Sequence, residues 1–202
     1  MPDLWLATAN EKKRKELERI LAPLGFRLRT MQELANPLEI VEDAPDFAGN
    51  ARKKAVTLAK TVASWALGDD SGLCVDALDG RPGVLSARYA GPGASDADRI
   101  QKLLRELAGR PPEQRKARFV CSICIADPDG QVRLEVEETC EGRILEASRG
   151  REGFGYDPVF SPDASRDRTF AELPAAEKDI LSHRGKALRR LADSLRLIQQ
   201  QQ

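Results

Sequence analysis

Two adjacent aspartates, Asp69 and Asp70, lie in the segment Gly68-Asp-Asp-Ser-Gly72, just before an apparent buried strand over 73–78. Neighbouring carboxylates repel each other, and a bound divalent cation removes that cost. Oxygen-only ligands suit Mg²⁺, which commonly binds one or two carboxylates together with the phosphates of a substrate. The alternative is a tight Asx turn that carries two exposed acids.

A second stretch, Thr8-Ala-Asn-Glu-Lys-Lys13, lies where a short apolar run meets a predicted helix. The first turn of a helix presents backbone N–H groups and the positive end of the helix dipole, which together bind phosphate. Thr8, Asn10 and Lys13 add side-chain donors. The alternative is an ordinary helix cap at Asn10 with solvated lysines. The absence of a Walker A sequence argues against a P-loop.

Two further stretches have residue types that suit a purine. In Gly153-Phe-Gly-Tyr-Asp-Pro158, Phe154 offers a ring for stacking and Asp157 an acceptor for ring N–H groups. The alternative is a hairpin or β-bulge around a buried aromatic.

The last stretch is Ser182-His-Arg-Gly185, which follows Lys178 and can begin the final helix. Cations are unfavourable at a helix N-terminus, so His183 and Arg184 suggest a ligand there. The alternative is a plain surface feature. His183 is the one histidine of the chain, which excludes metal sites built from several histidines.

Cys121 and Cys124 form an isolated CxxC pair within a segment that reads as a strand. Residues three apart on a strand point to opposite faces, so the two sulfurs should not converge on a metal. We therefore expect buried, reduced thiols rather than a zinc or redox site.

The charge balance is even, with 32 lysines and arginines against 32 aspartates and glutamates among 202 residues. Nucleic-acid-binding domains carry a basic surplus, so we expect no nucleic-acid partner. No apolar run approaches the roughly 20 residues of a membrane span. The first residues lack the basic and long apolar regions of a signal peptide, so we expect no membrane partner and a cytoplasmic location.

Apolar periodicity predicts the elements that position these stretches. Helices are expected between Asn10 and Gly25, over 47–64, over 95–109 and around Leu188–Leu195. Strands are expected over 4–7, 26–30, 73–78, 119–126 and 132–140, the last two as an antiparallel hairpin. Strands alternate with helices early and a hairpin comes late, which favours α/β with a mixed, largely antiparallel-edged sheet flanked by helices. We expect one domain over 1–198 and a frayed tail over 199–202.

Together, six motifs resemble the inosine triphosphate pyrophosphatase family, and they occur in the family's order between Leu6 and about Leu191. The six motifs are Thr8-Ala-Asn-Glu-Lys-Lys13, Phe47-Ala-Gly-Asn-Ala-Arg-Lys-Lys-Ala55, Asp69-Asp-Ser-Gly-Leu73, Pro82-Gly-Val-Leu-Ser-Ala-Arg-Tyr-Ala-Gly91, Gly153-Phe-Gly-Tyr-Asp-Pro158 and Ser182-His-Arg184. Each motif alone is weak evidence for the family, but all six in the family's order are strong evidence. The usual pattern is altered at Ala44, Asp46, Gly49 and Gly68.

The resemblance implies two lobes around a nucleotide cleft, a homodimer, and Mg²⁺-dependent hydrolysis of ITP, dITP or XTP to the monophosphate and pyrophosphate. It also implies site residues. The phosphate-contacting positions are Thr8, Asn10, Lys13, Lys54 and Ser71. The metal-binding acids are Glu42 and Asp69, and the proposed general base is Asp70. The positions around the purine are Phe154, Asp157, Lys178, His183 and Arg184.

The implied selectivity has a chemical basis. Hypoxanthine and xanthine carry a 6-keto acceptor where adenine carries an amino donor, so cationic donors aimed at O6 favour the keto bases. Two alternatives stay open. One is a related pyrophosphatase that acts on other modified nucleotides, and the other is a catalytically silent nucleotide-binding module.

Overall fold

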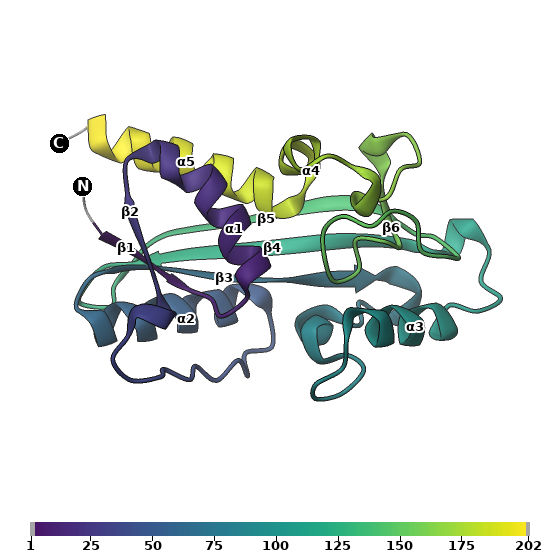
Figure 1. The fold of residues 1–202 in the computed structure, drawn as a ribbon, viewed down its shortest axis with the longest axis horizontal. Helices are drawn as coiled ribbons and strands as arrows, with labels where there is room; N and C mark the ends of the chain where they lie inside the picture. Colours follow the sequence, from purple (N-terminus) through teal and green to yellow (C-terminus); the bar gives the residue numbers. More distant parts are fainter. Residues whose placement is uncertain (1–2, 201–202) are drawn as a thin grey trace. The chain divides into compact units, whose positions relative to one another are not determined.

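Within residues 3–200, which the computed structural model describes, the short apolar runs form one six-stranded sheet and the amphipathic segments form helices (Figure 1). The strands are β1 (Asp3–Ala7), β2 (Arg27–Thr30), β3 (Trp65–Val75), β4 (Lys116–Ala126), β5 (Val132–Ile144) and β6 (Phe160–Pro162). The α-helices are α1 (Glu11–Leu21), α2 (Phe47–Val62), α3 (Asp96–Glu106), α4 (Ala175–Leu181) and α5 (His183–Gln200).

The sheet order is β2-β1-β3-β4-β5-β6. Strand β1 pairs in parallel with β2 and β3, whereas β5 and β6 at the other end pair antiparallel. This mixed sheet with flanking helices confirms the predicted fold class. Strands β4 and β5 are neighbours, as the predicted hairpin requires, and in the turn that joins them the Asp127 N–H donates to the Gln131 carbonyl at 3.0 Å.

Helices α1 and α3 begin at side-chain caps, and the cap at Asn10 was predicted. Asn10 precedes α1, and its side-chain oxygen accepts from the backbone N–H groups of Lys12 and Lys13 at 3.0 and 3.2 Å. Ser95 precedes α3 and forms a capping box with Asp98. Such caps satisfy backbone donors that the first turn leaves without intrahelical partners.

The C-terminal helix α5 includes Gln199 and Gln200, which belong to the stretch expected to fray. The remaining two residues of that stretch, Gln201 and Gln202, lie outside the described residues. Helix α4 and strand β6 were not predicted from the sequence, because each is too short to show a clear apolar period.

The prediction for the strand over 73–78 was wrong in its bounds. Strand β3 runs from Trp65 to Val75 and contains Asp69 and Asp70, which were expected just before it. Glycine and aspartate have low strand propensity. Here β3 lies between β1 and β4 in the sheet, and backbone pairing on both sides outweighs that propensity.

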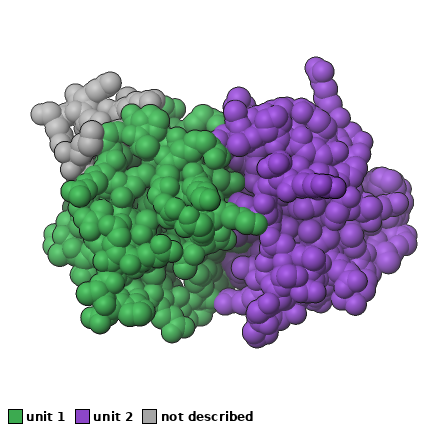
Figure 2. Space-filling view, viewed as in Figure 1, with its two compact units in different colours: residues 1–70, 121–138, 184–202 green, residues 71–120, 139–183 purple. Residues whose placement is uncertain are grey.

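The chain divides into two units, which Figure 2 colours separately. Unit 1 comprises residues 1–70, 121–138 and 184–202, and unit 2 comprises residues 71–120 and 139–183. Strands β3, β4 and β5 each contribute residues to both units.

Unit 1 has an apolar cluster on each face of its part of the sheet. On one face, leucines of α1 and α5 pack against Leu6, Leu67 and Ile123, and on the other the small residues of α2 pack against Ala66 and Ala126. Figure 1 shows α1 and α5 on one side of the strands and α2 on the opposite side. The alternation of side chains along β3 and β4 produces this division.

The two cysteines of the CxxC pair follow the same alternation. Cys121 belongs to the cluster beneath α1 and α5, and Cys124 belongs to the cluster beneath α2. Both are buried free thiols, so the prediction that they point to opposite faces is confirmed.

Unit 2 has one core, in which three phenylalanines, Phe119, Phe160 and Phe170, pack with leucines of α3. The rings of Phe119 and Phe160 meet edge to face, with centroids 4.8 Å apart. Over residues 3–200, no helix has both the length and the apolar content that crossing a membrane requires.

Candidate active site

The paired aspartates of unit 1 point to opposite faces of β3, because adjacent residues of a strand alternate. Asp69 shares a face with Leu67, beneath α1 and α5, whereas Asp70 shares a face with Ala66, beneath α2. The two carboxylates therefore have different side-chain partners. Mutual repulsion between the two carboxylates is reduced because each one has its own cationic neighbours.

Helix α2 supplies the partners of Asp70. The amide of Asn50 donates to Asp70 Oδ2 at 3.1 Å, and Lys54 Nζ donates to Asp70 Oδ1 at 3.1 Å. The same Lys54 Nζ lies 2.8 Å from Oε2 of Glu42, in the loop before α2. One ammonium group therefore contacts two carboxylates from separate segments.

Gly68 allows α2 to approach the strand this closely. A Cβ at Gly68 would lie 2.1 Å from the carbonyl oxygen of Ala51 and 2.7 Å from the backbone nitrogen of Ala55. Both are backbone atoms of α2 and cannot turn aside.

Burial raises the pKa of the Asp70 carboxyl above its ordinary value, and the charges of Lys54 and Lys13 lower it without cancelling that effect. The Asp70 side chain is 9% exposed and that of Glu42 is 43% exposed, against 1% for Asp69. The Asp70 face is thus the one where a carboxylate pair retains contact with solvent.

The carboxylate of Asp69 is bound on both oxygens. Lys13 Nζ lies 2.5 Å from Oδ1, and Arg184 Nε donates to Oδ2 at 3.1 Å. The Cys121 thiol also donates to Oδ2, at 3.2 Å. Arg184 is held further by Glu16, whose Oε2 accepts from Nη1 at 2.5 Å.

These contacts set the ionisation around Asp69. Burial alone would raise the pKa of Asp69, but the charges of Arg184 and Lys13 outweigh it and hold that pKa far below the ordinary range. Burial raises the pKa of the Cys121 thiol well above its usual value, and the charge of Asp69 adds to the effect. Cys121 is therefore a neutral hydrogen-bond donor.

The remaining predicted phosphate residues lie at three places. Thr8 Oγ1 accepts from the Asn10 N–H at 3.1 Å and so fixes the chain where β1 leads into α1. Lys13 follows on the first turn of α1. Ser71 is half-buried in β3 and is the first residue of unit 2.

The purine-side residues of unit 2 centre on Asp157. Its Oδ2 accepts from Lys178 Nζ at 2.7 Å and from the Phe154 N–H at 2.8 Å. Gly153 is required here, because a Cβ would lie 2.1 Å from the same oxygen and the backbone φ is +75°. Lys178 Nζ lies over the Phe154 ring, 4.9 Å from its centroid.

His183 belongs to the aromatic part of the same unit. Its imidazole stacks on Phe119, with ring centroids 4.6 Å apart and planes 6° from parallel. Phe170 links this stack to Lys178, with its centroid 6.0 Å from that of Phe119 and 5.7 Å from Lys178 Nζ. The structure thus brings together Phe154, Asp157, Lys178 and His183 through shared neighbours in unit 2, and Arg184 instead contacts residues of unit 1.

Sequence reasoning missed several partners of the predicted residues. Asn50 lies four residues before Lys54 on α2, and Glu16 lies three residues after Lys13 on α1, so helical spacing could have indicated both. Cys121 and Phe119 had no such signal, since a strand residue's cross-sheet neighbours depend on register.

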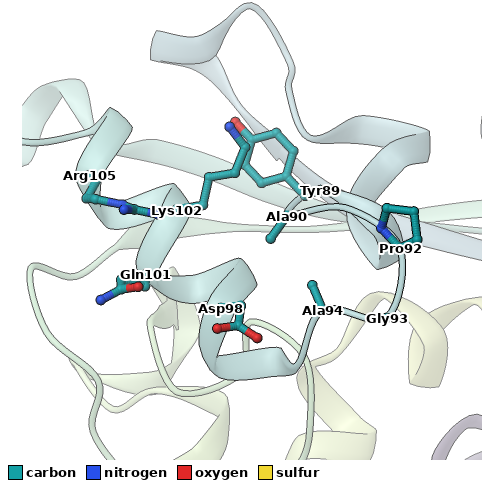
Figure 3. A pocket seen from close by; sticks show the side chains of 9 residues that line it. All are labelled: Tyr89, Ala90, Pro92, Gly93, Ala94, Asp98, Gln101, Lys102 and Arg105. Atoms are coloured by element: carbon teal, nitrogen blue, oxygen red, sulfur yellow. The ribbon is translucent and has the colours of Figure 1, made fainter.

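A pocket lies in unit 2, between α3 and the preceding loop (Figure 3). Its volume is about 630 Å³. The lining residues are Tyr89, Ala90, Pro92, Gly93, Ala94, Asp98, Gln101, Lys102 and Arg105. These residues include none of the predicted site residues. Among the described residues, no group of three or more histidine, cysteine, aspartate or glutamate side chains is placed to hold a metal ion.

The fold and its side-chain clusters define the class: an α/β protein with a mixed sheet, a carboxylate cluster around Lys54 in unit 1 and an aromatic cluster around Lys178 in unit 2. The family model of the Ham1 family matches residues 4–194. The chain therefore belongs to the Ham1 family, in agreement with the resemblance of its six motifs.

Individual relatives span nearly the whole chain. A dITP/XTP pyrophosphatase of Desulfotalea psychrophila is 50% identical over 188 residues, which cover 93% of this chain and 82% of that protein. A dITP/XTP pyrophosphatase of Rhodopirellula baltica is 47% identical over 201 residues, covering 98% and 96%. The solved structure of a HAM1 protein from Coxiella burnetii has a TM-score of 0.87 and 40% identity, covering 96% of this chain and 98% of that one.

Proposed function

We propose that this protein hydrolyses non-canonical purine nucleoside triphosphates, namely ITP, dITP and XTP, to the monophosphate and pyrophosphate with Mg²⁺ as cofactor. The observation that carries the proposal is the contact of Lys54 with both Glu42 and Asp70 in a Ham1-family chain. The names of the relatives support the same activity.

The donor set fits Mg²⁺, because two oxygen ligands from the protein leave the other positions for water and phosphate. From the resemblance we expected Glu42 and Asp69 as the metal-binding acids. The contacts support Glu42 in that role, since its side chain is 43% exposed, whereas both oxygens of Asp69 are bound by Lys13, Arg184 and Cys121; Asp70 is then left for the proton transfer. When bound, Mg²⁺ neutralises phosphate charge and lowers the pKa of a coordinated water.

Asp70 is the proposed proton acceptor. Its raised pKa makes the carboxylate a better base than an ordinary exposed aspartate, and Asn50 orients it through Oδ2. The attacking water loses its proton to Asp70, its oxygen adds to phosphorus, and the bond between the α and β phosphates breaks with release of pyrophosphate. Lys13 and Lys54 stabilise the negative charge on the phosphate oxygens.

The remaining predicted donors position the phosphates. Thr8 and Asn10 hold the start of α1, and Ser71 adds a hydroxyl from β3. Together with the two lysines they orient the triphosphate so that the α–β linkage faces the base.

The purine side of the site selects keto bases. Phe154 stacks on the ring system, and Asp157 accepts a ring N–H. Lys178 and His183 donate towards O6, where adenine would present a donor against a donor. Arg184 was expected beside them, but its guanidinium binds Asp69 and Glu16. By resemblance to the family, the protein is a homodimer and acts in the cytoplasm.

A substrate panel tests the proposal. The purified protein is assayed for pyrophosphate release from ITP, XTP, ATP, GTP and CTP, with Mg²⁺ and with excess EDTA. We expect rapid release from ITP and XTP and none with EDTA. Release from ATP should be much slower because of its 6-amino donor, and release from GTP, which also has a 6-keto group, should be much slower because of its 2-amino donor. Equal turnover of all the nucleotides would contradict the selectivity. Tight ITP binding without pyrophosphate release would instead favour a silent nucleotide-binding module, and preference for CTP a related pyrophosphatase.

A further inference from the structure

We propose that Asp96, the first residue of α3, is a positioning residue that holds the loop over 153–158 in the conformation that receives the purine. This inference rests on the proposed function, because that function assigns the stacking role to Phe154 on the same loop. Asp96 is 59 residues away in sequence from the loop glycine that it contacts, and the motifs of the sequence did not include it.

The contact is direct. Asp96 Oδ2 accepts a hydrogen bond from the backbone N–H of Gly155 at 2.9 Å. The other carboxylate oxygen accepts from Arg99, one turn further along α3. Arg99 in turn donates to the carbonyl oxygens of Ala87 and Ala94, at 2.9 and 2.6 Å. Because Arg99 Nη1 is bound to two backbone carbonyls while Nη2 donates to Asp96, the orientation of the Asp96 carboxylate is fixed.

The loop presents two successive backbone donors to two different carboxylates. The Phe154 N–H donates to Asp157 within the loop, and the next N–H, that of Gly155, donates to Asp96 outside it. Gly155 has a φ of +60°, a conformation that is unfavourable for other residues. Anchoring both N–H groups fixes the two peptide planes that flank the Phe154 Cα, and with them the direction in which the Phe154 side chain leaves the backbone towards Lys178.

The cap of α3 is formed by other groups. Ser95 Oγ accepts from the Asp98 N–H at 3.2 Å, and the Asp98 carboxylate accepts from the Ser95 N–H at 2.9 Å. Asp96 and Asp98 thus lie in the same helical turn, with the same charge and different tasks. Asp98 caps the helix, and Asp96 reaches the purine loop.

This division supplies a matched pair of variants. Asp96→Ala removes the acceptor for Gly155, whereas Asp98→Ala removes only the cap. For ITP hydrolysis by the full-length protein, we expect Asp96→Ala to raise KM about 10-fold, as for loss of a charge-assisted hydrogen bond, with kcat changed less than KM. Asp98→Ala should lower Tm and leave KM near the wild-type value. Asp96→Asn keeps an acceptor oxygen and should restore most of the lost affinity.

Hydrogen exchange followed by mass spectrometry gives a second readout that requires no turnover. A peptide containing residues 153–158 should exchange faster in Asp96→Ala than in the wild type, and at the wild-type rate in Asp98→Ala. Wild-type KM and exchange in Asp96→Ala would overturn the inference, as would equal changes in both alanine variants. Failure of the proposed function is distinguishable, because then the wild type itself releases no pyrophosphate while the exchange comparison still reports on the loop.

Discussion

Asp69 and Asp70 are the same residue type at successive positions of one strand, yet their surroundings differ in almost every respect. Asp69 is bound by Lys13, Arg184 and the Cys121 thiol, and its pKa is held far below the ordinary range. Asp70 is bound by Asn50 and Lys54, and its pKa is raised.

The difference shows that adjacency in sequence is not adjacency in function. The pleat of β3 directs one carboxylate towards α1 and α5 and the other towards α2. A carboxylate whose charge is compensated by three donors contributes to folding and makes a poor base. A carboxylate that burial penalises takes up a proton more readily, which suits a group in the reaction.

The largest expected effect is on catalysis. Asp70→Asn removes the proton acceptor, so ITP turnover should fall about 10³-fold, within the range for loss of general base catalysis. Stability should change little, because the fold does not favour the charged form of Asp70. Pyrophosphate release and urea unfolding of the same preparation measure both quantities. Retained turnover would remove Asp70 from the base role.

The same substitution at the adjacent residue, Asp69→Asn, should act mainly on stability rather than on turnover. Asp69→Asn leaves the Arg184 guanidinium buried without its main counter-charge, so the free energy of unfolding should fall by about 3 kcal/mol. That value is at the low end for a buried pair, since Lys13 is half-buried and can reach solvent. Urea titration measures the loss. If Asp69→Asn proves as stable as the wild type but inactive, the assignment of the two faces is reversed.

A smaller loss should follow from separating α2 from the strand. In Gly68→Ala, the new methyl group overlaps the Ala51 carbonyl, and overpacking of this kind costs about 2 kcal/mol. The shift of α2 also moves Asn50 and Lys54 away from Asp70, so turnover should decrease together with stability. The thermal midpoint and the ITP assay check these two effects. An unchanged midpoint would mean that the helix moves without cost.

The smallest change in stability and turnover is expected for a substitution on the exposed face of α2. Arg52 forms a bidentate pair with Glu135, with N···O distances of 2.9 and 3.0 Å, but the pair is exposed. Solvent and salt screen such pairs, so Arg52→Ala should leave the urea midpoint and ITP turnover within experimental error. This variant is the control for α2, and a measurable loss of turnover would indicate that the whole helix surface affects Asp70.

Much of this arrangement follows from local sequence patterns. The cap at Asn10 and the start of a helix at residue 95 follow from local residue types, and the structure confirms both. Helical periodicity places Lys54 at the margin of the apolar stripe of α2 and Lys53 away from it, and in the structure Lys54 is buried and Lys53 is exposed.

The assignment of the two aspartates depends on information that the local sequence lacks. Two consecutive polar residues hide the two-residue alternation of a strand, so Asp69 and Asp70 resembled a turn. Their partners come from α1, α2, α5 and β4, which are brought together only by the order of strands in the sheet. The stacking of Phe119 on His183 was not predicted for the same reason, because it depends on the arrangement of the strands and not on local sequence.

The stacking of His183 on Phe119 has a practical consequence for spectroscopy. Because the untagged chain contains a single histidine, the two carbon-bound imidazole protons give one unambiguous set of NMR signals. A ring 4.6 Å from a parallel phenylalanine experiences its ring current, which moves those signals upfield. The chain thus carries an intrinsic reporter whose chemical shift records, without any label, how closely these two rings remain stacked when a nucleotide is added.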